Sequence, residues 1–389
     1  MKKKIAILGS TGSIGKTLIN IIKQDKKNFD IVLLSAEGNY KELLKQAKYF
    51  KVKNLIITNE NSYKKIKKDK YTKNIKIFNN FNSFKKIFKT NVDYTMSSIT
   101  GIQGLKPTID IIKYSKKIAI ANKEAIICGW NLIQKNLNKY KTQFIPVDSE
   151  HFSIWYALKN TDKKLIKNIY ITASGGPFLN TPLNKLKNAK IKQAINHPNW
   201  QMGKKISIDS ANLMNKIFEV IEAKNIFNIP YDRIKILIHP KSYVHAILQL
   251  KNGLTKIIAH DTTMKIPIFN TLHDNKIFFN NYSTLNTNVL NGLSFKEVDY
   301  KRFPVIKLLK ILPKKNTLFE TVLVSANDKL VDLFLNKIIS FNSIHNELFK
   351  IMSLKEFKKL KKIYPKNIQD ILKLNDYVRL KISKKVYKS

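Results

Sequence analysis

The stretch KIAILGSTGSIGKTLINII (residues 4–22) decides the fold class. Residues 4–8 are a short apolar run, a glycine-containing segment follows, and apolar residues then recur at helical spacing from Ile14 to Ile22. This order predicts a strand, a tight turn and a helix, which is how a dinucleotide-binding sheet begins. The glycine spacing is GxxGxxG rather than GxGxxG, so the motif gains its value from its position directly after the first strand.

Short apolar runs continue beyond this unit and alternate with lysine-rich segments of helical period. They cover residues 29–36, 52–58, 75–78, 92–98, 117–121 and 142–147. Strands that alternate with helices predict a doubly wound, mostly parallel sheet. The sequence therefore predicts an α/β protein whose Rossmann-like, dinucleotide-binding domain spans residues 1–147.

The remaining chain has a different pattern. Strand-like runs separated by glycines and prolines predict an α+β catalytic domain over residues 148–275, with a long irregular stretch at 175–205. Residues 276–300 are rich in Asn and are expected to be a linker, and the helical period of residues 301–389 predicts a C-terminal helical bundle. The strand runs are 166–173, 235–238, 244–250 and 256–260, and the helical segments are 303–312, 318–336, 343–352 and 366–386.

Length and composition indicate a multidomain soluble protein. The chain has 389 residues, 43% hydrophobic and 25% charged, and no apolar run approaches the length of a membrane span. The first apolar run ends at Gly9, which is too short for a secretory signal, and the single cysteine, Cys128, fits a reducing compartment. We therefore expect a cytoplasmic protein without a membrane partner.

The formal net charge of +44 raises the alternative of a basic nucleic-acid-binding protein. The charge comes almost entirely from lysines spread over the whole chain, because Arg occurs only at positions 233, 302 and 379. Base readout relies on Arg, and basic tails form dense blocks. The pattern therefore favours solvated lysine faces over nucleic-acid binding.

The glycine turn is the predicted cofactor site. The backbone N–H groups at the start of the following helix can accept a pyrophosphate, although a structural turn without a ligand is the alternative. Glu37 follows the second strand, about twenty residues after the motif. An acid at this position hydrogen-bonds the ribose and disfavours a 2′-phosphate, so this residue alone predicts NAD rather than NADP.

Acidic residues predict a metal site. Asp148 and Glu150 follow the strand at 142–147 and would share one face if the strand geometry continued. In a helix, Asn215 and Glu219 lie at i, i+4, and Lys216 and Glu219 at i, i+3. Each acid alone is more commonly a solvated surface charge, but together three oxygen ligands suit Mg²⁺ or Mn²⁺ better than zinc.

Hydroxyl and amide donors predict a phosphate site. Ser174 precedes two glycines in a loop suited to an anion, and Ser210, Asn215 and Lys216 supply further donors. Ser210 has an alternative role as the N-cap of a helix beginning there. His197 lies in the long irregular stretch near Trp200, whose ring would cover a ligand; a structural role in a turn is its alternative.

These motifs resemble the 1-deoxy-D-xylulose 5-phosphate reductoisomerase family. The resemblance covers residues 1 to about 335 and rests on GSTGSIG (9–15), ANKE (121–124), PVDSEH (146–151), SGGPF (174–178), HPNWQMGKKISIDSANLMNK (197–216) with Glu219, and LIHPKS (237–242). It implies an NADPH-dependent, divalent-metal-dependent enzyme, using Mg²⁺, Mn²⁺ or Co²⁺, that converts 1-deoxy-D-xylulose 5-phosphate to 2-C-methyl-D-erythritol 4-phosphate in the non-mevalonate isoprenoid pathway. It also implies a homodimer.

The resemblance assigns roles residue by residue. Asp148, Glu150 and Glu219 match metal ligands, and the stretch 197–204 matches a flexible loop that closes over substrate. The matched catalytic positions are Lys123, Asp148, Glu150, His197 and Glu219; the substrate-binding positions are Lys123, Ser149, Glu150, Ser174, His197, Ser210, Asn215, Lys216 and Glu219; the cofactor-binding positions are Thr11, Gly12, Ser13, Ile14, Asn39, Asn122, Glu124 and Gly203.

Two points stay open at this stage. The resemblance implies NADPH, whereas Glu37 by itself predicts NAD. A metal-independent NAD(P)-linked dehydrogenase on the same two-domain plan is the main alternative among enzymes, and chelator-insensitive activity would favour it. A non-catalytic relative is disfavoured by the complete set of carboxylates.

Overall fold

The computed structural model describes residues 1–273 and 285–386 and divides them into two units. Unit 1 contains residues 1–126, residues 131–148 and helix α11 (Lys265–His273). Unit 2 contains residues 127–130, residues 149–263 and the described residues from 285 onward. The first part of the expected linker at 276–300 lies outside the described residues, and the rest contains a short helix, α12 (Thr287–Asn291).

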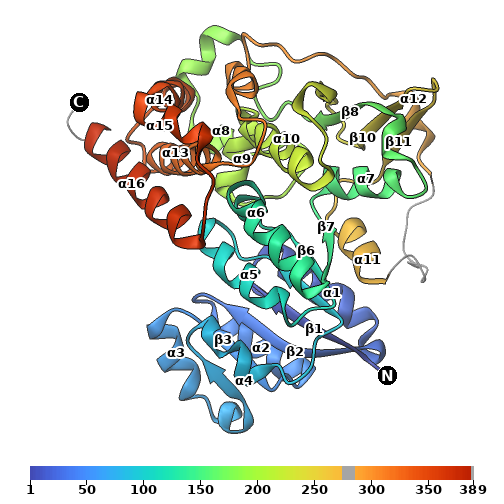
Figure 1. The fold of residues 1–389 in the computed structure, drawn as a ribbon, viewed down its shortest axis with the longest axis vertical. Helices are drawn as coiled ribbons and strands as arrows, with labels where there is room; N and C mark the ends of the chain where they lie inside the picture. Colours follow the sequence, from blue (N-terminus) through green and yellow to red (C-terminus); the bar gives the residue numbers. More distant parts are fainter. Residues whose placement is uncertain (274–284, 387–389) are drawn as a thin grey trace. The chain divides into compact units, whose positions relative to one another are not determined.

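Unit 1 is built on a seven-stranded sheet of order β4-β3-β2-β1-β5-β6-β7, with every neighbouring pair parallel (Figure 1). The strand order changes direction between β1 and β5, which is where doubly wound sheets bind ligands. The strands are β1 (Lys3–Leu8), β2 (Phe29–Ala36), β3 (Asn54–Ile57), β4 (Lys76–Phe78), β5 (Tyr94–Ser97), β6 (Lys117–Ile120) and β7 (Gln143–Pro146). The predicted doubly wound fold is confirmed.

The helices of unit 1 connect successive parallel strands, as the alternating sequence pattern requires. They are α1 (Ser13–Gln24), α2 (Tyr40–Phe50), α3 (Glu60–Lys67), α4 (Phe84–Ile87), α5 (Leu105–Ile112) and α6 (Lys123–Tyr140). Helix α11 also belongs to this unit, although the sequence pattern groups residues up to 275 with the second domain. It packs on α1, and the Thr271 hydroxyl lies 3.0 Å from the Tyr94 hydroxyl.

Unit 2 contains a mixed four-stranded sheet of order β11-β10-β8-β9 and the helices around it (Figure 1). Strands β8 (Ile166–Ala173) and β9 (Ile234–Ile238) are parallel, whereas β10 (Val244–Leu250) is antiparallel to both β8 and β11 (Thr255–Ala259). Helices α7 (Ser149–Leu158) and α10 (Met214–Phe227) share one apolar core with this sheet, which includes Ile154, Ile169, Val220 and Leu248. This common core fixes the two helices against each other.

The C-terminal part of unit 2 is helical, as expected. Helix α13 (Leu318–Leu335) packs against α14 (Phe341–Ser353) and α16 (Ile368–Val386), and α15 (Lys355–Lys359) lies between α14 and α16 in the chain (Figure 1). Thr317 and Glu320 form a capping box at the start of α13. Across residues 1–273 and 285–386, no helix combines the length and the apolar character that crossing a bilayer requires.

Candidate active site

Two helices of unit 2 carry two of the three predicted metal ligands, Glu150 and Glu219. Strand β7 ends at Pro146, and the chain turns into α7 at Ser149, so Glu150 lies in the first turn of a helix. The expectation that Asp148 and Glu150 share one strand face is therefore wrong, because the strand ends before either residue. The side chain of Ser149 donates to Glu150 Oε2.

Helix α10 carries the other charged groups and confirms the predicted i, i+3 and i, i+4 spacing. Asn215 Nδ2 donates to Glu219 Oε1, and Lys216 Nζ donates to Glu219 Oε2. His151 on α7 connects the two helices, because its Nε2 donates to the backbone oxygen of Glu219 at 2.8 Å. The donor must be Nε2–H, since a carbonyl only accepts.

The ammonium of Lys216 lies between two carboxylates. It contacts Glu219 and lies 2.8 Å from Glu150 Oε1, and only 4% of Lys216 is exposed. Burial by itself lowers the pKa of Lys216, but the nearby carboxylates of Glu150 and Glu219 outweigh burial and raise it above its ordinary value. Lys216 is therefore a permanent buried cation at the junction of α7 and α10.

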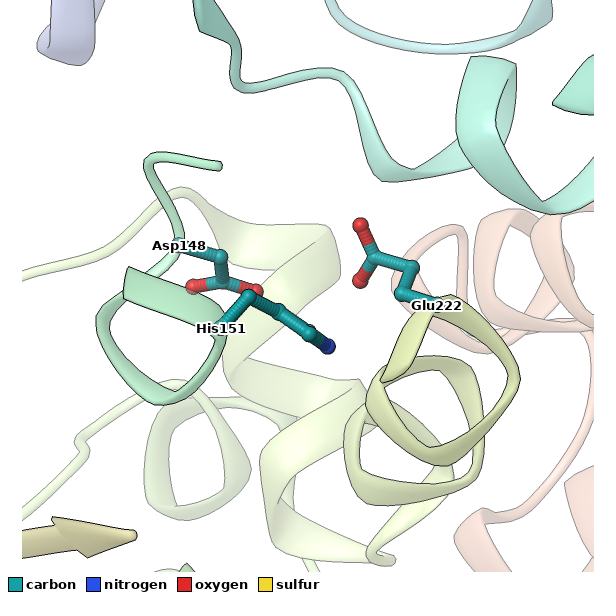
Figure 2. Close-up of side chains that lie close together, drawn as sticks. All are labelled: Asp148, His151 and Glu222. Atoms are coloured by element: carbon teal, nitrogen blue, oxygen red, sulfur yellow. The ribbon is translucent and has the colours of Figure 1, made fainter. Parts of the chain in front are cut away.

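Two groups of three side chains have the geometry of a metal site. One is Asp148, Glu150 and Glu219; the other is Asp148, His151 and Glu222 (Figure 2). In each group, one ligand atom per residue lies within 4.8 Å of the others. Asp148 is the last residue of unit 1 and is bonded to Ser149, the first residue of the adjoining segment of unit 2.

The carboxylate group of Asp148, Glu150 and Glu219 fits a hard divalent cation better than the second group does. Mg²⁺ and Mn²⁺ prefer oxygen ligands, and the second group offers an imidazole nitrogen in place of one carboxylate. All three carboxylates already pair with a cation. Lys216 pairs with Glu150 and Glu219, and Lys123 Nζ lies 2.9 Å from Asp148 Oδ2. The residues present therefore fit the divalent metal that the sequence predicts.

The loop after β8 forms a hydrogen-bond chain suited to an anion. His197 Nδ1 accepts from the backbone amides of Asn199 and Trp200 at 3.1 and 3.0 Å. The neutral ring must then carry its proton on Nε2, which donates to Ser174 Oγ at 2.9 Å. Ser174 Oγ also accepts from the amide of Gly176 at 3.0 Å, so the serine directs its own proton elsewhere.

The pKa of His197 supports the hydrogen-bond pattern of a neutral ring. Burial and the nearby ammonium of Lys216 lower the pKa of His197 to about 4, which keeps the ring neutral near pH 7.

Ser210 is not a helix N-cap. It lies near the end of α9 (Lys204–Ala211), and the next helix begins only at Met214. Gly176, with φ +66°, packs so closely on the α9 backbone that an added Cβ would lie 2.8 Å from the Ser210 oxygen. The Ser174 loop and Ser210 are therefore neighbours, as a shared anion site requires.

The glycine turn has the geometry of a phosphate-binding turn. It lies between β1 and α1, and Gly12 occupies the helix N-cap. Gly9, with φ +81°, approaches the loop after β5, because an added Cβ would lie 2.8 Å from the Ser98 oxygen. The turn therefore lies at the point where the strand order reverses. Thr11, Ser13 and Ile14 belong to this turn and to the first residues of α1.

The other predicted cofactor residues occupy helix starts. Asn39 caps α2 by accepting from the Glu42 amide, and Asn122 caps α6 by accepting from the Ala125 amide. Asn122 Nδ2 also donates to the Gly101 oxygen at 2.8 Å, so it holds the loop after β5. Glu124 lies buried in the first turn of α6, and Gly203, the N-cap of α9, lies in unit 2.

Several residues near the site were missed from sequence. His245 and His260 stack with ring centroids 3.8 Å apart, and their pKa values are lowered mainly by burial, that of His245 to about 3. Buried Asp209, next to Ser210, accepts from Asn327 Nδ2 of α13 at 2.7 Å and pairs with Lys205 at 3.1 Å. Glu222 and Asp209 had local signals, since Glu222 follows Glu219 at i+3 and Asp209 follows Lys205 at i+4. The contacts of His245 with His260 and of Asp209 with Asn327 join residues 15 and 118 positions apart.

Comparison with known proteins gives one consistent result. Three family models match: 1-deoxy-D-xylulose 5-phosphate reductoisomerase over residues 5–129, its C-terminal domain over residues 144–227, and the DXP reductoisomerase C-terminal domain over residues 261–381. A 1-deoxy-D-xylulose 5-phosphate reductoisomerase of Pelagibacter ubique is 58% identical over 383 residues, which are 98% of this chain and 99% of the relative. A Wolbachia enzyme of the same name, from Drosophila simulans, is 40% identical over 88% of each chain.

Solved structures agree. The Zymomonas mobilis enzyme in complex with NADPH has a TM-score of 0.88 at 29% identity and covers 99% of each chain. A DOX-P reductoisomerase in complex with NADPH, fosmidomycin and magnesium has a TM-score of 0.90 at 28% identity, covering 99% of this chain and 98% of that one. The chain belongs to the 1-deoxy-D-xylulose 5-phosphate reductoisomerase family.

Proposed function

We propose that this protein converts 1-deoxy-D-xylulose 5-phosphate to 2-C-methyl-D-erythritol 4-phosphate, with NADPH as reductant and a divalent metal as cofactor. The observation that carries the proposal is the group of Asp148, Glu150 and Glu219, which adjoins the buried ammonium of Lys216 in a chain of this family. The product feeds isoprenoid precursor synthesis.

The phosphate of the substrate binds at the Ser174 loop. Ser174 accepts two hydrogen bonds, from His197 and Gly176, and so presents its own proton to a phosphate oxygen. Ser210, Asn215 and Lys216 complete the donor set. Fixing this end of the substrate supplies binding energy that orients the reacting end.

Asp148, Glu150 and Glu219 would hold the metal, which when bound supplies Lewis-acid polarisation of the substrate oxygens during the skeletal rearrangement. Lys123 pairs with Asp148 at 2.9 Å and matches the family's lysine near the reacting carbons. Ser149 donates to Glu150 and so orients one of the carboxylates. His151 fixes the distance between α7 and α10 through its bond to the Glu219 backbone.

The glycine turn would hold NADPH, which when bound supplies a hydride for the reduction. Thr11, Gly12, Ser13 and Ile14 would hold its pyrophosphate at the start of α1, and Asn39, Asn122, Glu124 and Gly203 would complete the cofactor set. Glu37 is exposed at the end of β2 and lowers the preference for the 2′-phosphate without abolishing it. The stretch 197–204 closes over the substrate and excludes water.

The finer properties remain predictions. The resemblance implies the use of Mn²⁺ or Co²⁺ in place of Mg²⁺ and a homodimeric assembly. The sequence pattern predicts a cytoplasmic location and the domain boundaries at 147, 275 and 300. The absence of a nucleic-acid partner likewise stays a prediction, based on the dispersed lysines.

The test is NADPH oxidation by the purified protein with 1-deoxy-D-xylulose 5-phosphate and Mg²⁺. We expect turnover that stops on addition of a chelator and returns with excess Mg²⁺ or Mn²⁺. Activity that survives the chelator would favour a metal-independent dehydrogenase, and a tenfold preference for NADH in kcat/KM would overturn the cofactor assignment.

A further inference from the structure

Glu219 holds two groups that the proposed function assigns to the substrate. Its Oε1 accepts from Asn215 Nδ2, and its Oε2 accepts from Lys216 Nζ. Lys216 Nζ also lies 2.8 Å from Glu150 Oε1. The ammonium therefore contacts the same two carboxylates that would hold a divalent cation, and the two cations compete for one set of oxygens.

Lys216 is also linked to the anion-binding loop. The backbone of Gly176 packs on Ser210, the Ser210 oxygen accepts from the Leu213 amide at 3.2 Å, and the Leu213 oxygen accepts from the Lys216 amide at 3.1 Å. Lys216 thus connects two sites of opposite charge preference. On one side are the carboxylates of Glu150 and Glu219; on the other is a set of neutral donors.

We propose that Lys216 exchanges between the carboxylates of Glu150 and Glu219 and a bound phosphate group, so that divalent-cation binding and phosphate binding strengthen each other. This inference rests on the proposed function and adds a coupling between its two ligands. Asn215 exchanges in the same way, from Glu219 to the phosphate, because Glu219 holds it through the other carboxylate oxygen.

The physical reason is the cost of an unpaired buried charge. A lysine that is 4% exposed must keep an anionic partner, because breaking a buried ion pair leaves an uncompensated charge. A divalent cation that takes the oxygens of Glu150 and Glu219 neutralises them and repels the ammonium. The ammonium then needs another anion, and a phosphate at the Ser174 loop provides one.

Linkage makes the effect reciprocal. If Mg²⁺ raises the affinity for phosphate, phosphate raises the affinity for Mg²⁺ by the same factor, and coupling between two sites is typically about 5- to 150-fold. We therefore expect Mg²⁺ to raise the phosphate affinity of this protein at least about fivefold.

The experiment is isothermal titration of the full-length protein with inorganic phosphate, at zero and at saturating free Mg²⁺, with the solution Mg²⁺–phosphate complex accounted for. Wild-type protein should bind phosphate at least about fivefold more tightly with Mg²⁺. The variant Lys216→Met should bind phosphate weakly and with the same affinity in both conditions. It should bind Mg²⁺ alone at least as tightly as wild type, because the competing ammonium is gone.

Lys205→Met is the matched control. It also removes one lysine from a buried acid in the same unit, Asp209, but not from Glu150 or Glu219. The Mg²⁺ effect on phosphate affinity should persist in this variant. Circular dichroism of each variant checks that the fold is retained.

Glu219→Gln gives an independent test in the opposite direction. Loss of the carboxylate charge loosens the hold on Lys216 and Asn215, so phosphate affinity without Mg²⁺ should rise towards the wild-type value with Mg²⁺, while Mg²⁺ affinity falls. Simple damage to the site would instead weaken both ligands.

The outcomes separate the inference from the proposed function. If wild-type protein binds both ligands independently, or if Lys216→Met retains the coupling because Mg²⁺ contacts phosphate directly, the inference fails and the proposed function stands. If wild-type protein binds neither ligand, both fail.

Discussion

The substitution Gly15→Ala has two opposing effects on the stability of the protein. Gly15 lies inside α1, where Ala is favoured over Gly by about 1 kcal/mol in helix propensity, so local preference alone predicts stabilisation. In the structure, however, an added Cβ would lie 2.4 Å from the Gly9 oxygen and 2.5 Å from the Ser10 Cα atom. Both are backbone atoms of the glycine turn, so α1 would have to move away from the end of β1.

The expected size follows from overpacking. Forcing extra atoms into a packed region costs typically about 1–3 kcal/mol, which equals or exceeds the gain in propensity. We therefore expect Gly15→Ala to lower the free energy of unfolding by up to about 2 kcal/mol. Because the same movement displaces the start of α1, we also expect NADPH to bind at least about tenfold more weakly, equivalent to about 1.4 kcal/mol.

Gly12→Ala is the control for the stability part of this prediction. At Gly12 an added Cβ lies 3.4 Å from the Gly9 oxygen, an ordinary contact, and its φ of −78° is accessible to Ala. Stability should change by less than about 1 kcal/mol, since only the preference at the N-cap is affected. Urea unfolding followed by circular dichroism and NADPH titration measure both quantities. A Gly15→Ala protein that is more stable than wild type and binds NADPH normally would refute the close approach of α1 to the turn.

Three further predictions concern single side chains. The pKa of His197 is lowered to about 4 from an ordinary 6.5, so between these pH values the unfolded chain binds a proton that the folded protein excludes. The free energy of unfolding should therefore fall as pH drops from 6.5 towards 4. His197→Gln should flatten this slope in urea unfolding at stepped pH, and an unchanged slope would contradict the assignment. Asn327→Leu removes a buried donor to the Asp209 carboxylate and should lower the free energy of unfolding by about 1.5–3 kcal/mol, and a loss below about 0.5 kcal/mol in urea unfolding would show that this bond contributes little. Glu37→Gln should raise the ratio of kcat/KM for NADPH over NADH about fivefold, because an exposed charge beside a phosphate contributes about 1 kcal/mol in water; an unchanged ratio would place the 2′-phosphate away from Glu37.

The fold was predictable because it depends on local pattern. The predicted strands match the observed ones to within two residues, since a buried strand of a parallel sheet is a continuous apolar run. The pairing of Asn215 and Lys216 with Glu219 was predictable for the same reason, because neighbours on one helix face follow from residue spacing alone.

The errors lie where local structure changes or where distant residues meet. Asp148 and Glu150 were expected on one strand face, but the chain turns into a helix at Ser149. The sequence allows Ser210 as the N-cap of a helix, but the residue lies near the end of α9. Asp209 beside it is a buried partner of Asn327, 118 residues away. The bond of Lys216 to Glu150 spans 66 residues and needs α7 and α10 on one shared core. Residue spacing carries no signal for such contacts.

The most direct test of the central claim compares wild-type protein with Glu150→Gln. Each is incubated with 1-deoxy-D-xylulose 5-phosphate, NADPH and Mg²⁺, and the products are identified by NMR. We predict that wild-type protein forms 2-C-methyl-D-erythritol 4-phosphate with one NADPH consumed per product. Glu150→Gln should retain NADPH binding and lose turnover by at least about a hundredfold, as loss of a group that acts in the transition state typically does. Equal turnover by the two proteins would contradict the assignment of the carboxylates on α7 and α10 to the metal.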